Sequence, residues 1–281
     1  MSAKPGHTAL PATSPGPTAP HARSPIADAF AARAGSAALM PYLMGGFPTL
    51  ELSRDIGLAC ADAGADVLEL GVPYSDPLAD GPVIHEAGTQ ALAAGATLAG
   101  VLNVARTLSP RVPVVLMCYT NLVLASGARA FAQRLAETGA GGLIVPDLPL
   151  EEAPELLAAC DEVGIDLVPL VAPTTPPQRL AAIGARARGF LYTVSVVGTT
   201  GERATLSGRF AQVVERARAS TTVPVALGFG ISTPEHVRQA AEAGADGVIV
   251  GTRLVREAAE AADPARAVGS LVGALADALT G

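Results

Sequence analysis

The amino-acid sequence predicts an α/β fold, a (β/α)8 TIM barrel formed as a single domain. Apolar runs of strand length alternate with helical patterns, and eight units of roughly thirty residues follow one another. Several units share a phrase in which a glycine ends the helix and a short turn leads into the next strand, as in residues 63–70 and 243–250. A doubly wound open sheet is the alternative, but no Gly-x-Gly-x-x-Gly follows the first predicted strand.

The predicted strands are continuous apolar runs, which is typical of a parallel sheet buried on both faces. They cover residues 38–43, 66–70, 112–118, 142–145, 166–170, 189–194, 223–227 and 246–250. The predicted helices cover residues 26–34, 50–63, 98–108, 128–138, 151–163, 177–186, 206–219, 234–243 and 264–279. Asp263 before Pro264 predicts an N-cap for the last helix, because its carboxylate can accept a hydrogen bond from a free amide.

Residues 1–25 are rich in Pro, Ala, Ser and Thr, and their pattern cannot build a core. We therefore expect a disordered Pro/Ala-rich tail before a barrel of residues 26–281. The tail lacks the apolar segment of a secretory signal, and no run approaches the ~18 apolar residues that a membrane span requires. The sequence predicts no membrane partner.

Composition excludes several other classes of function. A net charge of −7 argues against binding to nucleic acid. The three cysteines, Cys60, Cys118 and Cys160, form no Cys-x-x-Cys pair, and the four histidines are scattered. Neither a disulfide framework nor a metal site is expected, and small buried thiols fit a reducing cytosol. We predict a cytoplasmic protein without a metal or organic cofactor.

The segment from Leu68 to Pro82 carries three carboxylates among apolar, small or loop-forming residues. Glu69 closes the second predicted strand, where a carboxylate costs several kcal/mol unless it is paired, protonated or used. Asp80 follows eleven residues later in a loop rich in Pro and Gly, which can fold back over the strand end. The pattern predicts a general acid/base pair. Asp76 precedes a proline, so we expect it to organise a turn.

Other candidate residues follow the later strands, and the carboxyl ends of barrel strands share one rim. They are Asp147 after the fourth strand, Tyr192 in the sixth, Gly228 and Gly230 after the seventh, and Gly251 and Thr252 after the eighth. The glycine-rich ends of the last two strands predict a phosphate cradle, since glycine lets backbone amides approach an anion and helix N-termini attract one. Tight turns are the alternative.

The remaining candidates leave alternatives open. Residues 197–203 follow the sixth strand and can form a lid or an ordinary surface loop. Tyr42 and Tyr119 can line a pocket or pack in the core. Asp147 is expected to support the site rather than to react, and His85 to lie on a helix surface.

The segment Glu-Leu-Gly at 69–71 and the segment Pro-Tyr-Ser-Asp-Pro-Leu-Ala-Asp-Gly-Pro at 73–82 closely resemble the signature of the tryptophan synthase α chain family. The resemblance continues from about Ser36 to the C-terminus. It implies cofactor-free cleavage of indole-3-glycerol phosphate to indole and glyceraldehyde 3-phosphate. It also implies an α2β2 complex with a β chain that carries pyridoxal phosphate.

The resemblance assigns roles to individual residues. Glu69 matches the general acid/base, and Asp80 matches the carboxylate that binds the indole N–H. Thr200 matches a lid residue that contacts this aspartate. The positions that match substrate or phosphate contacts are Tyr192, Gly201, Gly230 and Gly251.

Three alternatives remain at this point. The first is a free-standing lyase that releases indole. The second is another phosphate-binding barrel, such as an isomerase, against which the Glu69–Asp80 pair argues. The third is a non-catalytic subunit that only activates a partner, against which the intact carboxylates argue.

Overall fold

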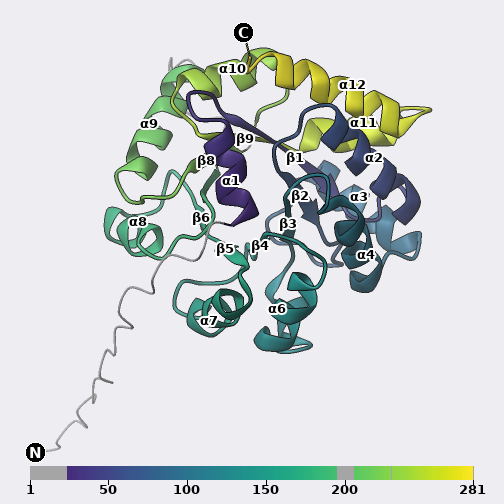
Figure 1. Ribbon diagram of the computed structural model, residues 1–281, viewed down its shortest axis with the longest axis horizontal. Coiled ribbons are helices and arrows are strands. Elements are labelled where there is room, and N and C mark those ends of the chain that lie inside the picture. The colour runs from purple at the N-terminus through teal and green to yellow at the C-terminus, as the bar shows by residue number, and fades with distance from the viewer. Residues whose placement is uncertain (1–23, 195–205, 229, 281) are drawn as a thin grey trace, which may run out of the picture.

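A computed structural model describes residues 24–194, 206–228 and 230–280, which form a barrel of parallel strands inside a ring of helices (Figure 1). The strands are β1 Ala38–Met44, β2 Leu68–Gly71, β3 Val114–Met117, β4 Gly142–Ile144, β5 Asp166–Val168, β6 Leu170–Val171, β7 Leu191–Val194, β8 Val225–Gly228 and β9 Gly247–Val250. Their order is β5-β4-β3-β2-β1-β9-β8-β7-β6, and the predicted (β/α)8 barrel is confirmed.

The helices of the described residues cover the outside of this barrel. They are α1 Pro25–Ala32, α2 Leu50–Asp62, α3 Pro82–Ala93, α4 Leu98–Leu108, α5 Thr120–Leu124, α6 Ala128–Ala136, α7 Ala153–Val163, α8 Pro177–Gly184, α9 Leu206–Arg218, α10 Pro234–Glu242, α11 Thr252–Glu260 and α12 Pro264–Asp277. Asp263 caps α12 as predicted, with its side chain accepting from the Arg266 amide at 3.2 Å.

The fifth barrel strand, predicted over residues 166–170, is divided at Pro169. β5 pairs only with β4, and β6 pairs only with β7. Proline has no N–H and cannot donate to a ladder, although its carbonyl still accepts from the Tyr192 amide at 3.0 Å. The nine strands are therefore the eight of the predicted barrel, with one interrupted.

Helix α1 lies across the N-terminal end of the barrel, at the centre of Figure 1. It begins one residue earlier than predicted because Ser24 caps it, accepting from the Ala27 amide at 3.1 Å. Ile26 is fully buried against Gly142, the first residue of β4, and Phe30 packs on Phe190 with ring centroids 5.7 Å apart. This helix covers the N-terminal end of the barrel, and the carboxyl ends of the strands form the opposite rim.

Helix α3 is missing from the helix bounds predicted from the sequence, although His85 was expected on a helix surface. Pro82 occupies its first turn, and Ile84, Ala87 and Ala91 form its buried face at helical spacing. Gly88 and Thr89 have low helix propensity and obscure this pattern in the sequence. The helix matters for function because it begins two residues after Asp80 and anchors the end of that loop.

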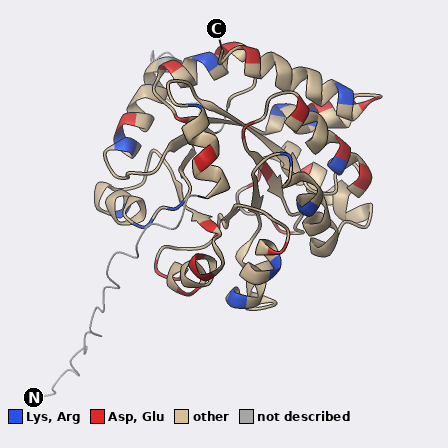
Figure 2. Ribbon diagram, in the orientation of Figure 1, with Lys and Arg blue, Asp and Glu red and all other residues tan. Residues whose placement is uncertain are grey.

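Acidic and basic residues lie mainly on the outer helices (Figure 2). Several of them form ion pairs, as Arg129 does with Glu162 and Arg218 with Asp246. Within the described ranges, no single helix is long and apolar enough to cross a membrane. One bent pair, α3 with α4 at 107°, passes that test by length and composition alone.

Candidate active site

Glu69 lies inside the barrel wall. Its strand, β2, pairs with β1 and β3 as far as Gly71. Glu69 therefore lies two residues before the end of the strand, whereas the sequence predicted that it closes the strand. The residue is only 1% exposed, and neither carboxylate oxygen has a hydrogen-bond partner among the described residues. Burial, and then the charge of Asp80, raise the pKa of Glu69 from 4.5 to about 8. At neutral pH this carboxyl holds its proton.

Asp80 approaches Glu69 from the loop between β2 and α3, as the sequence predicts. The two carboxyl groups are close enough for the charge of Asp80 to act on the pKa of Glu69. Burial raises the pKa of Asp80, while a hydrogen bond from Tyr119 and the charge of His85 oppose that shift. The geometry gives the two carboxyls different environments, which is the arrangement that separates an acid from an anion.

Tyr119 anchors the loop that carries Asp80. Its Oη accepts a hydrogen bond from the Ala79 amide at 3.1 Å. Its ring stacks on Tyr74, with centroids 5.2 Å apart and planes inclined by 27°. Burial raises the pKa of Tyr119 to about 12, so the hydroxyl keeps its proton and can donate to Asp80. The loop is therefore held at both its beginning and its end.

Two more tyrosines face Glu69 from other strands. Tyr42 on β1 lies at the register position opposite Glu69. Burial, followed by the charge of Glu69 and then Tyr42, raises the pKa of Tyr192 on β7 well above its ordinary value. The structure thus brings Tyr42, Tyr119 and Tyr192 together around the carboxyl pair. Their contact with a substrate stays a prediction.

The residues predicted to form a phosphate cradle lie at the same rim. Gly230 is exposed with a φ of 75°, which favours glycine, and Gly251 is the N-cap of α11 with Thr252 exposed at its first position. Helix N-termini therefore follow both β8 and β9, as expected of an anion site. Gly228 differs, because a Cβ there would collide with the Tyr192 ring. The predicted lid, with Thr200 and Gly201, lies outside the described residues.

The other two carboxylates singled out in the sequence, Asp147 and Asp76, hydrogen-bond residues next to them or at the start of α5. Asp147 accepts hydrogen bonds from the amide and the hydroxyl of Thr120, at 2.8 and 2.9 Å, and so fixes the start of α5 beside Tyr119. Asp76 is exposed and accepts from the Ser75 hydroxyl at 2.7 Å. His85 is exposed on α3. No group of three His, Cys, Asp or Glu side chains in the described ranges could hold a metal ion.

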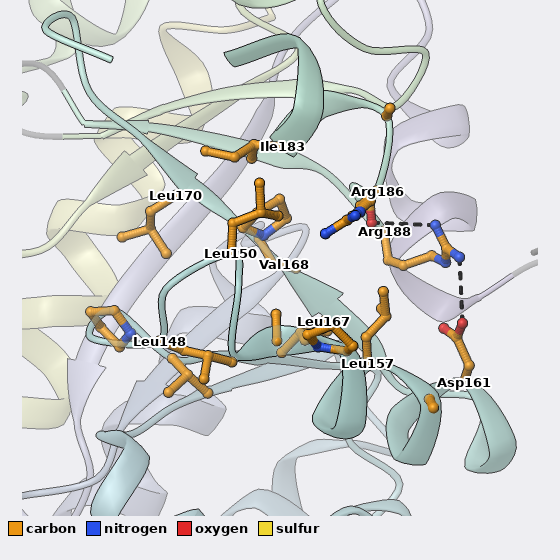
Figure 3. Close-up of a pocket in the computed structure, with 17 residues that line it drawn as sticks. Leu148, Leu150, Leu157, Asp161, Leu167, Val168, Leu170, Ile183, Arg186 and Arg188 are labelled. Carbon is orange, nitrogen blue, oxygen red and sulfur yellow. Dashed lines mark hydrogen bonds and ion pairs between the residues drawn. The ribbon is translucent and has the colours of Figure 1, made fainter. Parts of the chain in front are cut away.

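A cavity of about 460 Å³ lies elsewhere, between α7, α8 and the divided fifth strand (Figure 3). Leu157, Leu167 and Ile183 are among its apolar lining, and at one end Arg188 pairs with Asp161 at 3.4 Å. Neither Glu69 nor Asp80 lines it. The cavity therefore lacks the carboxyl pair that the sequence singles out.

Fold and site together define a class of enzyme, a (β/α)8 barrel with a buried protonated carboxyl opposed by a loop carboxylate at its open end. The family described as "Tryptophan synthase alpha chain" matches residues 29–278. The chain belongs to this family.

Individual relatives and solved structures are similar to the chain over most of its length. A tryptophan synthase alpha chain of Synechococcus sp. (strain CC9902) is 51% identical over 231 residues, covering 82% of this chain and 86% of that protein. The subunit alpha structure from Legionella pneumophila str. Paris has a TM-score of 0.85 and 38% identity, covering 92% and 99% of the two chains. Mycobacterium tuberculosis tryptophan synthase gives a TM-score of 0.84 at 38% identity, covering 91% and 98%.

Proposed function

We propose that the chain cleaves indole-3-glycerol phosphate to indole and glyceraldehyde 3-phosphate, as the α subunit of tryptophan synthase in the last steps of L-tryptophan biosynthesis. One observation carries the catalytic assignment: a buried carboxyl that keeps its proton at neutral pH faces an aspartate from the neighbouring loop. Family membership over residues 29–278 supports the substrate.

The cleavage is a retro-aldol reaction. Glu69 gives its proton to C3 of the indole ring, and the positive charge that develops at the ring nitrogen is stabilised by the carboxylate of Asp80. The hydroxyl on the carbon bonded to C3 then gives its proton to the Glu69 carboxylate, and the electron pair of that O–H bond forms the aldehyde carbonyl. The carbon–carbon bond then breaks, its electrons return to the ring, and indole leaves with the proton at C3. The two proton transfers balance, so the reaction needs no cofactor.

We expect the substrate phosphate to bind at the N-termini of α10 and α11, in contact with Gly230, Gly251 and Thr252, and with Gly201 from the predicted lid. Thr252→Val keeps the shape of the side chain and removes its donor. We expect the KM for indole-3-glycerol phosphate to rise about tenfold, because a hydrogen bond to a charged group is lost. Thr252→Ser, which keeps the hydroxyl, is the matched control and should have the wild-type KM in steady-state assays. An unchanged KM in Thr252→Val would place the phosphate elsewhere.

The chain works with a tryptophan synthase β chain, the pyridoxal-phosphate subunit, in an α2β2 complex. Two large apolar side chains are exposed near the rim, Leu78 in the loop before α3 at 84% and Leu124 at the end of α5 at 69%. Exposed apolar groups at one rim favour a protein partner. We also place the protein in the cytoplasm, where the buried thiols of Cys60, Cys118 and Cys160 would stay reduced.

Indole release from indole-3-glycerol phosphate, measured with and without a β chain, tests the proposal. We expect slow release by the isolated chain and faster release on titration with the β chain, since docking that orders the rim loops aligns Asp80 and Glu69 with the substrate.

Leu124→Glu should weaken this activation by the β chain without changing the rate of the isolated chain. The control is Leu92→Glu, at the far end of α3, where the side chain is 38% exposed. A chain that cleaves at full speed and ignores the β chain would favour the free-standing lyase. A chain that releases no indole under either condition would contradict the proposal.

A further inference from the structure

The ring of Tyr42 is clamped between two glycines on the strands that flank β1. On one side, a Cβ at Gly71 in β2 would collide with the Tyr42 hydroxyl and lie 2.8 Å from Cζ. On the other side, a Cβ at Gly251, just after β9, would lie 3.3 Å from Cβ and Cδ1 of Tyr42. Glycine at both positions leaves room for the ring and fixes its direction. The hydroxyl therefore extends across β2, the strand that carries Glu69.

Tyr42 and Glu69 are also neighbours in register. They are direct partners in the parallel pair of β1 and β2, so their side chains leave adjacent strands on the same face, about 4.8 Å apart at the backbone. Burial, then the charges of Asp80 and Glu69, raise the pKa of Tyr42 well above its ordinary value. The hydroxyl keeps its proton and is available only as a donor to these acids.

Glu69 needs such a donor once it has lost its proton. Both of its oxygens lack a partner among the described residues, and a buried carboxylate without hydrogen bonds is costly. The charge of Asp80 acts on Glu69 from the loop, and the charge of Glu69 in turn acts on Tyr42 from β1 and Tyr192 from β7. Asp80 repels the anion, whereas the hydroxyls can stabilise it.

We propose that Tyr42 is a positioning residue for Glu69, held by the Gly71–Gly251 clamp so that its hydroxyl donates to the Glu69 carboxylate when the proton moves to the substrate. The effect on catalysis rests on the proposed function. The hydrogen bond between Tyr42 and Glu69 does not depend on it. The clamp also explains Gly71 in the Glu-Leu-Gly segment as space for the tyrosine.

Tyr42→Phe keeps the ring and removes the donor. Without the donor the Glu69 anion is less stable, so the pKa of Glu69 should rise by about one unit and kcat should fall about tenfold. The alkaline limb of the kcat–pH profile should move upward with this pKa, while the KM stays within about twofold because the aromatic surface is unchanged. A change confined to KM would overturn the proposal.

Gly71→Ala should prevent the proposed hydrogen bond by displacing the Tyr42 hydroxyl. We expect it to lower kcat as Tyr42→Phe does, and the double variant to be no slower than the slower single variant, because both changes act on one hydroxyl. Fully additive losses would overturn the proposal. Gly273→Ala is the matched control, since a Cβ there meets nothing within 4 Å, and it should leave kcat unchanged.

A titration without substrate separates this inference from the proposed function. Infrared difference spectroscopy can follow the protonated Glu69 carboxyl with pH, with Glu69→Gln identifying its band. A pKa that is higher in Tyr42→Phe than in wild type supports the contact even if no indole is released. Equal pKa values in the two proteins would overturn it, whether or not Gly71→Ala folds.

Discussion

Glu69→Gln is expected to reduce kcat for indole release by about 10²–10⁴-fold, the range for loss of a general acid. The substitution preserves size and polarity but leaves no proton to give to the substrate carbon. The KM should change little, because the same surface faces the substrate. Steady-state cleavage of indole-3-glycerol phosphate measures both constants. Glu260→Gln, an exposed position in α11, is the matched control and should behave as wild type.

The same variant should be more stable than wild type at alkaline pH. The pKa of Glu69 is raised from 4.5 to about 8 in the folded protein, so the folded state holds a proton that the unfolded chain releases between those values. The free energy of unfolding of the wild type therefore falls as pH rises through this window, by up to about 1.4 kcal/mol per pH unit from this group. The Glu69→Gln substitution would remove that slope in urea unfolding measured at pH 6 and pH 9. Near-wild-type turnover, or an unchanged slope, would contradict the assigned role.

Asp80→Asn should reduce kcat by about 100-fold or more, because the amide cannot neutralise the positive charge that develops at the indole nitrogen. The fold should persist, since Tyr119 still holds the Ala79 amide and stacks on Tyr74. Activity should also lose its acid limb, because the group whose ionisation is required is gone. The kcat–pH profile of the variant, compared with that of wild type, measures both effects.

Asp76→Asn is the matched control for Asp80→Asn. It lies four residues earlier in the same loop, is exposed and bonds Ser75. Its turnover should stay within about twofold of wild type, as usual for a surface substitution. Equal losses at the two positions would mean that the loop, rather than the charge of Asp80, limits the reaction.

The barrel could be predicted from the sequence because its strands are continuous apolar runs and its helices end at glycines. Features that depend on contacts between distant segments could not be predicted in this way. The break at Pro169 arises from the lost amide donor within a strand that is otherwise uniformly apolar. Helix α3 was hidden by residues with low helix propensity, and it becomes stable only when Ile84 and its neighbours pack on the barrel.

In the site, too, some residues could be proposed from the sequence and others needed the structure. Glu69 and Asp80 could be proposed from the sequence because carboxylates are conspicuous beside a buried strand. The stacking of Tyr74 on Tyr119 and the collision that keeps Gly71 and Gly228 as glycines depend on how strands tilt past one another. In the sequence these glycines look like strand ends or phosphate contacts. Only the three-dimensional arrangement shows that Gly228 makes room for Tyr192.

The divided fifth strand has a consequence for the motions of the barrel wall. A barrel resists opening because its ladder of hydrogen bonds has no edge, and the missing proline donor leaves one seam in that ring. A separate small core flanks the seam on one side, formed by Val171, Leu180, Ile183, Leu191, Ala217 and Val225. We expect the free energy of local unfolding to be lowest at this interruption of the barrel wall. The Pro169 carbonyl accepts a hydrogen bond from the Tyr192 amide, so such an opening would shift the tyrosine beside Glu69. Fluctuations of this part of the barrel wall would therefore reach Glu69.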